Sequence, residues 1–330
     1  MNTSNPESIL VYVGLDRVGD GLLKLPFVRG LRKAFFNAHI TWVAGKERSV
    51  YASTLAPLVE GLLDEVVEYA GIGLHPSEFL RKPLAGRRFD LIIDSQKIFW
   101  ASLSLWRIPH KIFISPSAGF LLSSKKPPEG YKFPNSMQRQ LLDLLELASD
   151  ETFPTPINLG LKPSHQHWVD ARELLPVGSE YVGFAPGSGG RPKCWSLDNF
   201  IRLAQNQGEQ GRIPVFFLGP QEPELMAPIR DQVASALFPL QQKNNGFDPL
   251  FTMVLAEGMC ASVSNDSGVG HMIALAGKPL VSLFGPTMPE KFMPMSDRLT
   301  IIEAKEFGGR EMARIPYVTV AEALRKALAS

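Results

Sequence analysis

The residue types best suited to chemistry lie in one polar turn, Ser-Asn-Asp-Ser-Gly-Val-Gly-His at positions 264–271. An apolar strand is expected at 259–263 before it, and a short helix that ends at Gly277 and Pro279 after it. When a helix begins on small residues, the unbonded backbone N–H groups of its first turn can bind a ligand, usually a phosphate. Because the carboxylate of Asp266 repels a bare anion, we expect this turn to bind a nucleotide-linked substrate.

Within that turn each candidate has an alternative structural role. The amides at Gly268 to Gly270, next to Ser267, could receive a phosphate. Asp266 either binds a sugar hydroxyl or caps the helix. His271 either satisfies a local bond or, with a lowered pKa in the first helical turn, acts as a neutral donor to the ligand.

A second turn, Pro-Gly-Ser-Gly-Gly-Arg-Pro-Lys at 186–193, also follows an expected strand. Its backbone amides, the Ser188 hydroxyl and the Arg191 and Lys193 cations could hold a diphosphate and stabilise the charge that builds as it leaves. The spacing of its glycines fits neither a P-loop nor a dinucleotide fingerprint. Glu222 ends the next expected strand, where a carboxylate suits a bidentate bond to ribose hydroxyls, although a lone acid in a loop is often only solvated.

Regularly alternating strands and helices should position these turns. The expected strands are 9–13, 39–44, 65–68, 90–95 and 111–114, then 181–185, 214–218, 259–263, 280–284 and 299–302. The expected helices include 22–36, 49–58, one within 76–84, 98–105 and 138–148, then 164–175, 197–207, 224–236, 249–257 and 319–329. Such alternation predicts parallel sheets with helices on both faces, and ligands beyond the carboxyl ends of the strands.

The pattern restarts once, so we expect two Rossmann-like, doubly wound α/β domains, 1–160 and 161–330, that face each other across a cleft. A proline-rich stretch at 152–163 is the expected linker, and the last helix, about 319–329, could pack back on the first domain. Residues 115–136, rich in Ser, Lys, Pro and Gly, predict a long loop on the acceptor side.

Composition excludes several classes of protein. The chain has 330 residues, 45% of them apolar, and a net charge of +1, which argues against a nucleic-acid partner. Its two cysteines have no metal-ligand spacing, and the sequence predicts neither a signal peptide nor a membrane span. We therefore expect a cytoplasmic protein.

Three separated motifs, in order, carry a resemblance: Gly-Leu-Asp-Arg-Val-Gly-Asp-Gly-Leu-Leu-Lys-Leu-Pro from position 14, Pro-Gly-Ser with Lys193 and Trp195, and the 264–271 turn followed by Phe-Gly-Pro-Thr. Together they resemble the glycosyltransferase family 9 heptosyltransferases of lipopolysaccharide core assembly. The resemblance implies a GT-B fold, ADP-heptose as donor, a lipid-linked saccharide as acceptor, inversion at the anomeric carbon, and neither metal nor cofactor. It also implies peripheral contact with the inner membrane face.

The resemblance implies roles for residues of both domains. Asp20 would be the catalytic base, although an acid there could simply favour a helix N-terminus. Arg17 would bind negative groups of the acceptor, or else neutralise Asp16. On the donor side it implies Ser188, Lys193, Glu222, Asp266, Ser267, Gly268 and His271.

Two other functions stay open at this stage. One is a sugar-nucleotide 2-epimerase built on the same two domains. The other is a non-catalytic, nucleotide-binding scaffold.

Overall fold

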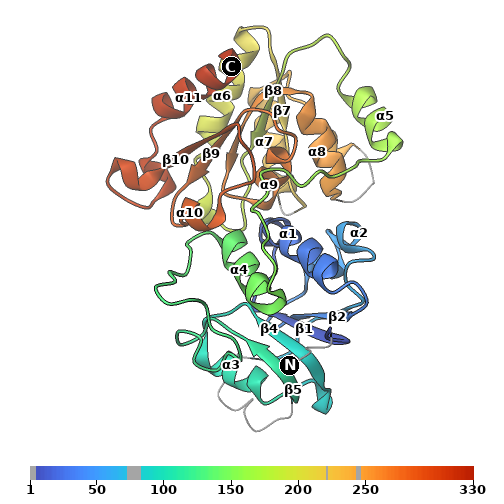
Figure 1. Ribbon diagram of the computed structural model, residues 1–330. Helices are drawn as coiled ribbons and strands as arrows, with labels where there is room; N and C mark the ends of the chain where they lie inside the picture. The colour runs from blue at the N-terminus through green and yellow to red at the C-terminus, as the bar shows by residue number, and fades with distance from the viewer. Residues whose placement is uncertain (1–4, 73–82, 221, 243–246) are drawn as a thin grey trace. The chain divides into compact units, whose positions relative to one another are not determined.

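The computed structural model describes residues 5–72, 83–220, 222–242 and 247–330, and the chain forms two compact units, Met1–Pro156 and Ile157–Ser330 (Figure 1). Each unit contains a five-stranded, wholly parallel sheet with helices on its faces. The two parallel-sheet α/β units that the strand and helix alternation predicts are therefore confirmed.

The sheet of the first unit has the strand order β3-β2-β1-β4-β5. Its strands are β1 (Ser8–Val13), β2 (His39–Ala44), β3 (Glu65–Val67), β4 (Phe89–Asp94) and β5 (His110–Ile114). The middle strands are continuous apolar runs because both of their faces are buried. The chain order reverses between β1 and β4, and in open sheets of this kind ligands bind beside such a reversal.

Within residues 5–72 and 83–156, four α-helices surround this sheet: α1 (Val18–Ala34), α2 (Ala56–Val59), α3 (Phe99–Trp106) and α4 (Met137–Ser149). Helices α1 and α4 pack against each other, whereas α3 contributes Ala101 and Leu105 to a core cluster with Leu10 and Phe113 of the sheet. The segment 115–136 has no helix or strand of its own, as expected.

The sheet of the second unit has a different order, β10-β9-β8-β6-β7. Its strands are β6 (Tyr181–Ala185), β7 (Ile213–Phe216), β8 (Met259–Asn265), β9 (Leu280–Phe284) and β10 (Leu299–Glu303). The reversal here lies between β6 and β8. Both polar turns of the sequence follow these two strands, so they meet at one edge of the sheet.

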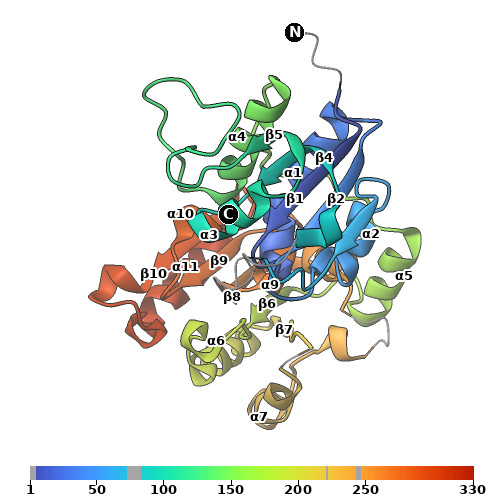
Figure 2. The same cartoon turned by 90° about the horizontal axis from the view of Figure 1, so that it is seen from below.

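Helices cover both faces of the second sheet (Figure 2). They are α5 (His165–Leu174), α6 (Leu197–Glu209), α7 (Met226–Gln232), α8 (Pro249–Glu257), α9 (Gly268–Ala274), α10 (Pro289–Phe292) and α11 (Tyr317–Ala329). Alternate residues of β6 divide between the faces: Val182 and Phe184 pack with α6 and α11, and Tyr181 with α5 and α8. Helix α11 packs on β8 and β9 of its own unit.

Three predicted helices differ from the observed ones. The first begins at Val18 instead of 22, so Asp20 lies in its first turn and Pro26 in its interior. Gly21, in this added turn of the helix, packs closely against the 50–55 segment, because a Cβ there would lie 2.6 Å from Leu55 Cδ1. The segment 49–58 divides into a 3₁₀ turn and α2, and 224–236 shortens to α7 after a 3₁₀ turn. Most of the helix expected within 76–84 lies outside the described residues.

Candidate functional site

An ion pair joins the two polar turns of the second unit. Lys193 Nζ lies 2.8 Å from Asp266 Oδ2, and Thr287 Oγ1 donates to the same oxygen at 2.7 Å. The Asp266 side chain is 7% exposed and that of Lys193 is 34% exposed. The carboxylate is thus fixed at the sheet edge, while the ammonium group can turn toward a ligand.

Asn265, a residue that sequence reasoning did not select, fixes the backbone of these turns. Its side chain is fully buried, donates to Pro186 O at 2.7 Å and accepts from Trp195 N at 3.1 Å. Both ends of the turn that carries Lys193 are therefore attached to the end of β8. The signal available in the sequence was its place between the buried strand and Asp266.

Trp195 packs in the core instead of presenting a stacking surface. Its ring is 1% exposed, lies 5.4 Å from that of Phe200, and donates through Nε1 to Ile315 O at 3.0 Å. These contacts of Trp195 attach the end of the turn at 186–193 to the core of the second unit.

Ser267 is the N-cap of α9, since its hydroxyl accepts from Gly270 N at 3.1 Å. The alternative role of Asp266 as the cap is therefore wrong. The Gly270 amide is already bonded, so any phosphate at this turn would meet the amides before it. Gly270 itself is required for packing, because a Cβ there would lie 2.7 Å from Ser264 Oγ.

Glu222 reaches back over the turn that follows β6. Its Oε2 accepts from Gly219 N at 2.5 Å, and a Cβ on Gly187 would lie 2.1 Å from its Cδ. Burial raises the pKa of this carboxyl above its ordinary value, and the Gly219 amide opposes that shift. The structure thus brings Glu222 beside the turn of Ser188 and Lys193.

The remaining donor-side candidates lie at the same edge. Ser188 Oγ donates to Gly190 O at 2.9 Å and shapes its own turn. His271 is 5% exposed in α9, directly after Gly270. Its role as a neutral donor to a ligand stays a prediction.

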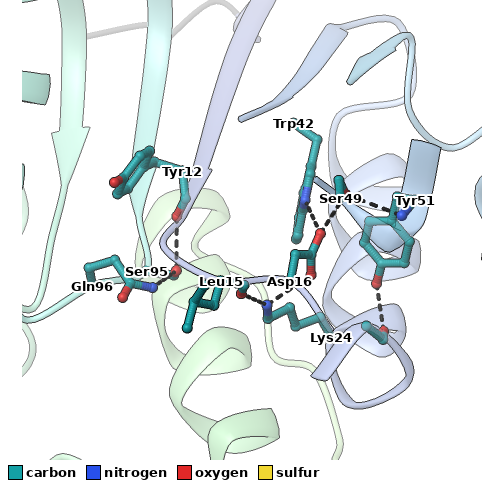
Figure 3. Close-up of polar contacts among 10 residues, drawn as sticks. Tyr12, Leu15, Asp16, Lys24, Trp42, Ser49, Tyr51, Ser95 and Gln96 are labelled. Atoms are coloured by element: carbon teal, nitrogen blue, oxygen red, sulfur yellow. Dashed lines mark hydrogen bonds and ion pairs between the residues drawn. The ribbon is translucent and has the colours of Figure 1, made fainter. Parts of the chain in front are cut away.

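In the first unit, Asp16 has partners that the sequence did not indicate (Figure 3). Lys24 Nζ lies 2.9 Å from its Oδ1, and its Oδ2 accepts from Trp42 Nε1 at 2.9 Å and Ser49 Oγ at 2.6 Å. Its partner is therefore Lys24 and not Arg17, which is exposed at the N-cap of α1. Because α1 begins at Val18, Lys24 lies in its second turn, where its ammonium group reaches Asp16.

Asp20 is half-buried in the first turn of α1, away from this network of bonds. The two carboxylates of the 14–21 turn therefore differ: Asp16 is committed to structure, whereas Asp20 lies at the carboxyl edge of β1.

A third carboxylate, Asp94, ends β4 across the strand reversal from β1. It is fully buried and accepts from Ser102 Oγ at 2.5 Å, Ser115 Oγ at 2.8 Å and Gln96 N at 2.9 Å. Burial raises its pKa to about 6, although these hydrogen bonds oppose the shift. Sequence reasoning missed it, because only its position at a strand end set it apart from other aspartates.

Comparison with known proteins identifies relatives of this chain. A family model described as glycosyltransferase family 9 (heptosyltransferase) matches residues 79–314. Lipooligosaccharide heptosyltransferase 2 of Haemophilus influenzae is 32% identical over 127 residues, which are 38% of this chain and 37% of that protein. The match thus spans little more than a third of that relative's length.

Solved structures share the fold over nearly the whole chain. The glycosyl transferase family 9 structure from Veillonella parvula has a TM-score of 0.68 at 22% identity, covering 98% of this chain and 97% of that one. The structure of E. coli ADP-heptose lps heptosyltransferase II has a TM-score of 0.65 at 22% identity and covers 98% of both chains. The fold is GT-B, and the chain belongs to glycosyltransferase family 9, the heptosyltransferase family.

Proposed function

We propose that this protein is an inverting glycosyltransferase that moves a heptose from ADP-heptose to a sugar hydroxyl of the lipopolysaccharide inner core, without a metal or a cofactor. The observation that carries the proposal is the Lys193–Asp266 pair at the carboxyl ends of β6 and β8. Family membership supports it, as do the activities for which the relative from H. influenzae and the protein of the E. coli structure are named.

The donor binds to the second unit. As a diphosphate arrives, the ammonium group of Lys193 turns from Asp266 to the phosphate oxygens, and the released carboxylate accepts a hydroxyl of the donor sugar. Ser188 and the amides at Ser267 and Gly268 add donors for the diphosphate. The neutral imidazole of His271 donates as well, and Glu222 accepts the ribose hydroxyls.

The first unit supplies the base and holds the acceptor. The Asp20 carboxylate removes the proton of the acceptor hydroxyl, whose oxygen attacks the anomeric carbon from the face opposite the diphosphate. The bond from that carbon to the diphosphate oxygen breaks, and ADP leaves with the electron pair. Lys193 and the amides stabilise the charge that develops on the leaving group.

A cavity of about 530 Å³ in the 116–133 segment suits an acceptor saccharide. The rings of Phe120, Tyr131 and Phe133 line it, and Lys97 Nζ lies 3.7 Å from the centroid of the Phe133 ring. Aromatic faces pack well against sugar rings, and a lysine attracts an anionic substituent. Arg17 would contribute a second cation for negative groups of the acceptor.

We also propose that the enzyme acts in the cytoplasm at the inner membrane face, where a lipid-linked acceptor is presented. Among the helices of the described residues, none is both long enough and apolar enough to cross a bilayer. Contact with the membrane would therefore be peripheral in the part of the chain that the structure describes.

The test is Asp20→Asn, with transfer from ADP-heptose to a core acceptor followed by mass spectrometry. Loss of a general base should lower kcat about 10²- to 10⁴-fold while ADP binding stays unchanged. Glu60→Gln, an exposed acid of the same unit, is the matched control. Transfer within threefold of wild type would show that Asp20 is not the base.

The two rival functions give different results in the same assay. An epimerase would convert a nucleotide sugar without any acceptor. A scaffold would bind ADP, seen as a thermal shift, but transfer nothing to any acceptor in a panel.

A further inference from the structure

Helix α3 (Phe99–Trp106) buries its two serines and exposes its aromatic residues, which is unusual for a surface helix. Its serines are inside: Ser102 is fully buried and Ser104 is 5% exposed. Its large aromatic residues are outside, with Trp100 60% and Trp106 46% exposed. A helix that only covered a sheet would show the opposite pattern, with apolar residues inward and polar residues toward water.

Specific bonds hold α3 in this orientation. Ser102 Oγ donates to the buried Asp94 carboxylate at 2.5 Å, and Ser104 Oγ donates to Trp100 O at 2.9 Å. Ala101 and Leu105 pack in the core beneath the helix. Turning the helix to hide its aromatic rings would strip Asp94 of a donor, so the outward face is built into the fold.

The exposed apolar residues of this part of the chain lie close together in the sequence. Ile98, Phe99, Trp100 and Trp106 are all exposed within a single short segment, and the rings of Phe99 and Trp100 lie 5.7 Å apart. Other exposed apolar side chains of the described residues, such as Phe36 and Val177, stand at separate points of the sequence. Isolated exposed apolar residues are ordinary, but a contiguous patch indicates an interaction surface.

The charge around the patch is positive. Lys97 precedes the helix and Arg107 follows it, and both are exposed. No acidic residue occurs in the sequence between Asp94 and Glu129, a stretch that holds five Lys and Arg residues. Two of these are paired with acids from outside it, Lys111 with Asp90 and Lys125 with Asp150. The two residues that border the aromatic patch in the sequence, Lys97 and Arg107, are both basic.

We propose that the outer face of α3, residues 98–107, docks on the surface of an anionic phospholipid bilayer. Tryptophan rings favour the region of lipid headgroups, where the indole body is apolar and its N–H meets water. Flanking Lys and Arg residues add attraction to anionic lipids. The inference deepens the proposed function, because it gives the first unit a surface for reaching a lipid-linked acceptor.

The experiment measures binding of the full chain to vesicles of a neutral phospholipid mixed with an anionic one, by co-sedimentation. The double variant W100A/W106A should bind at least about tenfold more weakly, because two large apolar side chains no longer enter the interface. Phe36→Ala, which removes a more exposed aromatic residue of the same unit, should bind within twofold of wild type. Arg107→Gln should lower binding about fivefold, and added salt should remove that difference.

Tryptophan fluorescence gives an independent readout. Vesicles with brominated acyl chains should quench the wild type, and W100F/W106F should lose most of the quenching. Of the three remaining tryptophans, Trp42 and Trp195 are buried, and Trp168 is partly buried against a core cluster of the second unit. Near-ultraviolet circular dichroism checks that each variant is folded. Equal binding or equal quenching of wild type and variants would overturn the proposal.

Measurements of self-association and of heptose transfer also test the proposal. Loss of self-association in W100A/W106A, with unchanged vesicle binding, would show that the patch joins two copies of the chain and would overturn the proposal. Transfer to a lipid-free acceptor should be unaffected in W100A/W106A. If wild type binds vesicles as described but never transfers heptose, the proposed function fails while the docking surface stands.

Discussion

Each unit holds a lysine–aspartate pair beside the reversal of its strand order, and the two pairs differ in burial. In the first unit Lys24 and Asp16 lie 2.9 Å apart with side chains 6% and 0% exposed. In the second unit Lys193 and Asp266 lie 2.8 Å apart, but a third of the lysine side chain meets solvent. Nearly equal distances thus accompany very different access to a ligand.

The partners around each aspartate extend this contrast. Trp42 and Ser49 occupy the second oxygen of Asp16, and Lys24 also donates to Leu15 O. Asp266 has only one further side-chain donor among the described contacts, Thr287. A buried, fully bonded pair fixes a loop, whereas a partly exposed pair can exchange a partner for a substrate.

The largest expected effect tests the structural role of the first pair. Asp16→Asn leaves the buried Lys24 ammonium without its carboxylate, so the free energy of unfolding should fall by about 3–5 kcal/mol. Asp266→Asn should lower it by no more than about 1 kcal/mol, because Lys193 can turn to water. Urea unfolding of both full-length variants measures the two losses, and equal losses would remove the distinction between the pairs.

A somewhat smaller effect concerns Asp94, the buried acid on the other strand of the first reversal. Its pKa rises to about 6 in the folded chain from an ordinary 3.8. The folded state therefore holds a proton that the unfolded chain has lost, and this stabilisation disappears as pH rises through 6. Relative to Asp94→Asn, wild type should lose about 2.5 kcal/mol of stability between pH 4 and pH 7.

Urea unfolding of both proteins across that pH range makes the measurement. The difference between them cancels the titration of shared groups. A constant difference would mean that Asp94 does not change its protonation there.

Next in size is the functional role of the second pair. Lys193→Gln should lower kcat about 10²-fold, since the leaving diphosphate loses a cation, while the unfolding free energy changes by less than about 1 kcal/mol. Lys326→Gln, an exposed lysine of α11, is the control and should do neither. A large stability loss without a kinetic one would make Lys193 structural, like Lys24.

The smallest effect concerns Glu222. Glu222→Gln should weaken ADP binding about tenfold, by removing a charged acceptor for the ribose hydroxyls. Calorimetric titration measures this, with the exposed Glu224→Gln as control. Because burial raises the Glu222 pKa, wild-type affinity should also fall at acid pH, and the variant should lack that fall. Unchanged affinity for ADP would show that Glu222 has only a structural role, in packing against Gly187.

The sequence predicted the sheets well because buried parallel strands are short apolar runs between turns. The expected strands 39–44, 181–185 and 280–284 have the observed bounds. Helix starts were less predictable. Helix α1 begins at Val18, four residues before the expected start, and its Gly21 packs against Leu55, a contact between segments far apart in the chain.

By itself, the sequence determined the succession of strands and helices along the chain, the two turns that follow β6 and β8, and the residue types in those turns. Only the tertiary structure decided which aspartate pairs with which lysine, that Asn265 holds both ends of the 186–195 segment, and that α3 turns its tryptophans outward. The reason is that periodicity reports burial along one element, whereas an ion pair, a clamp or an exposed face depends on neighbours that other elements bring.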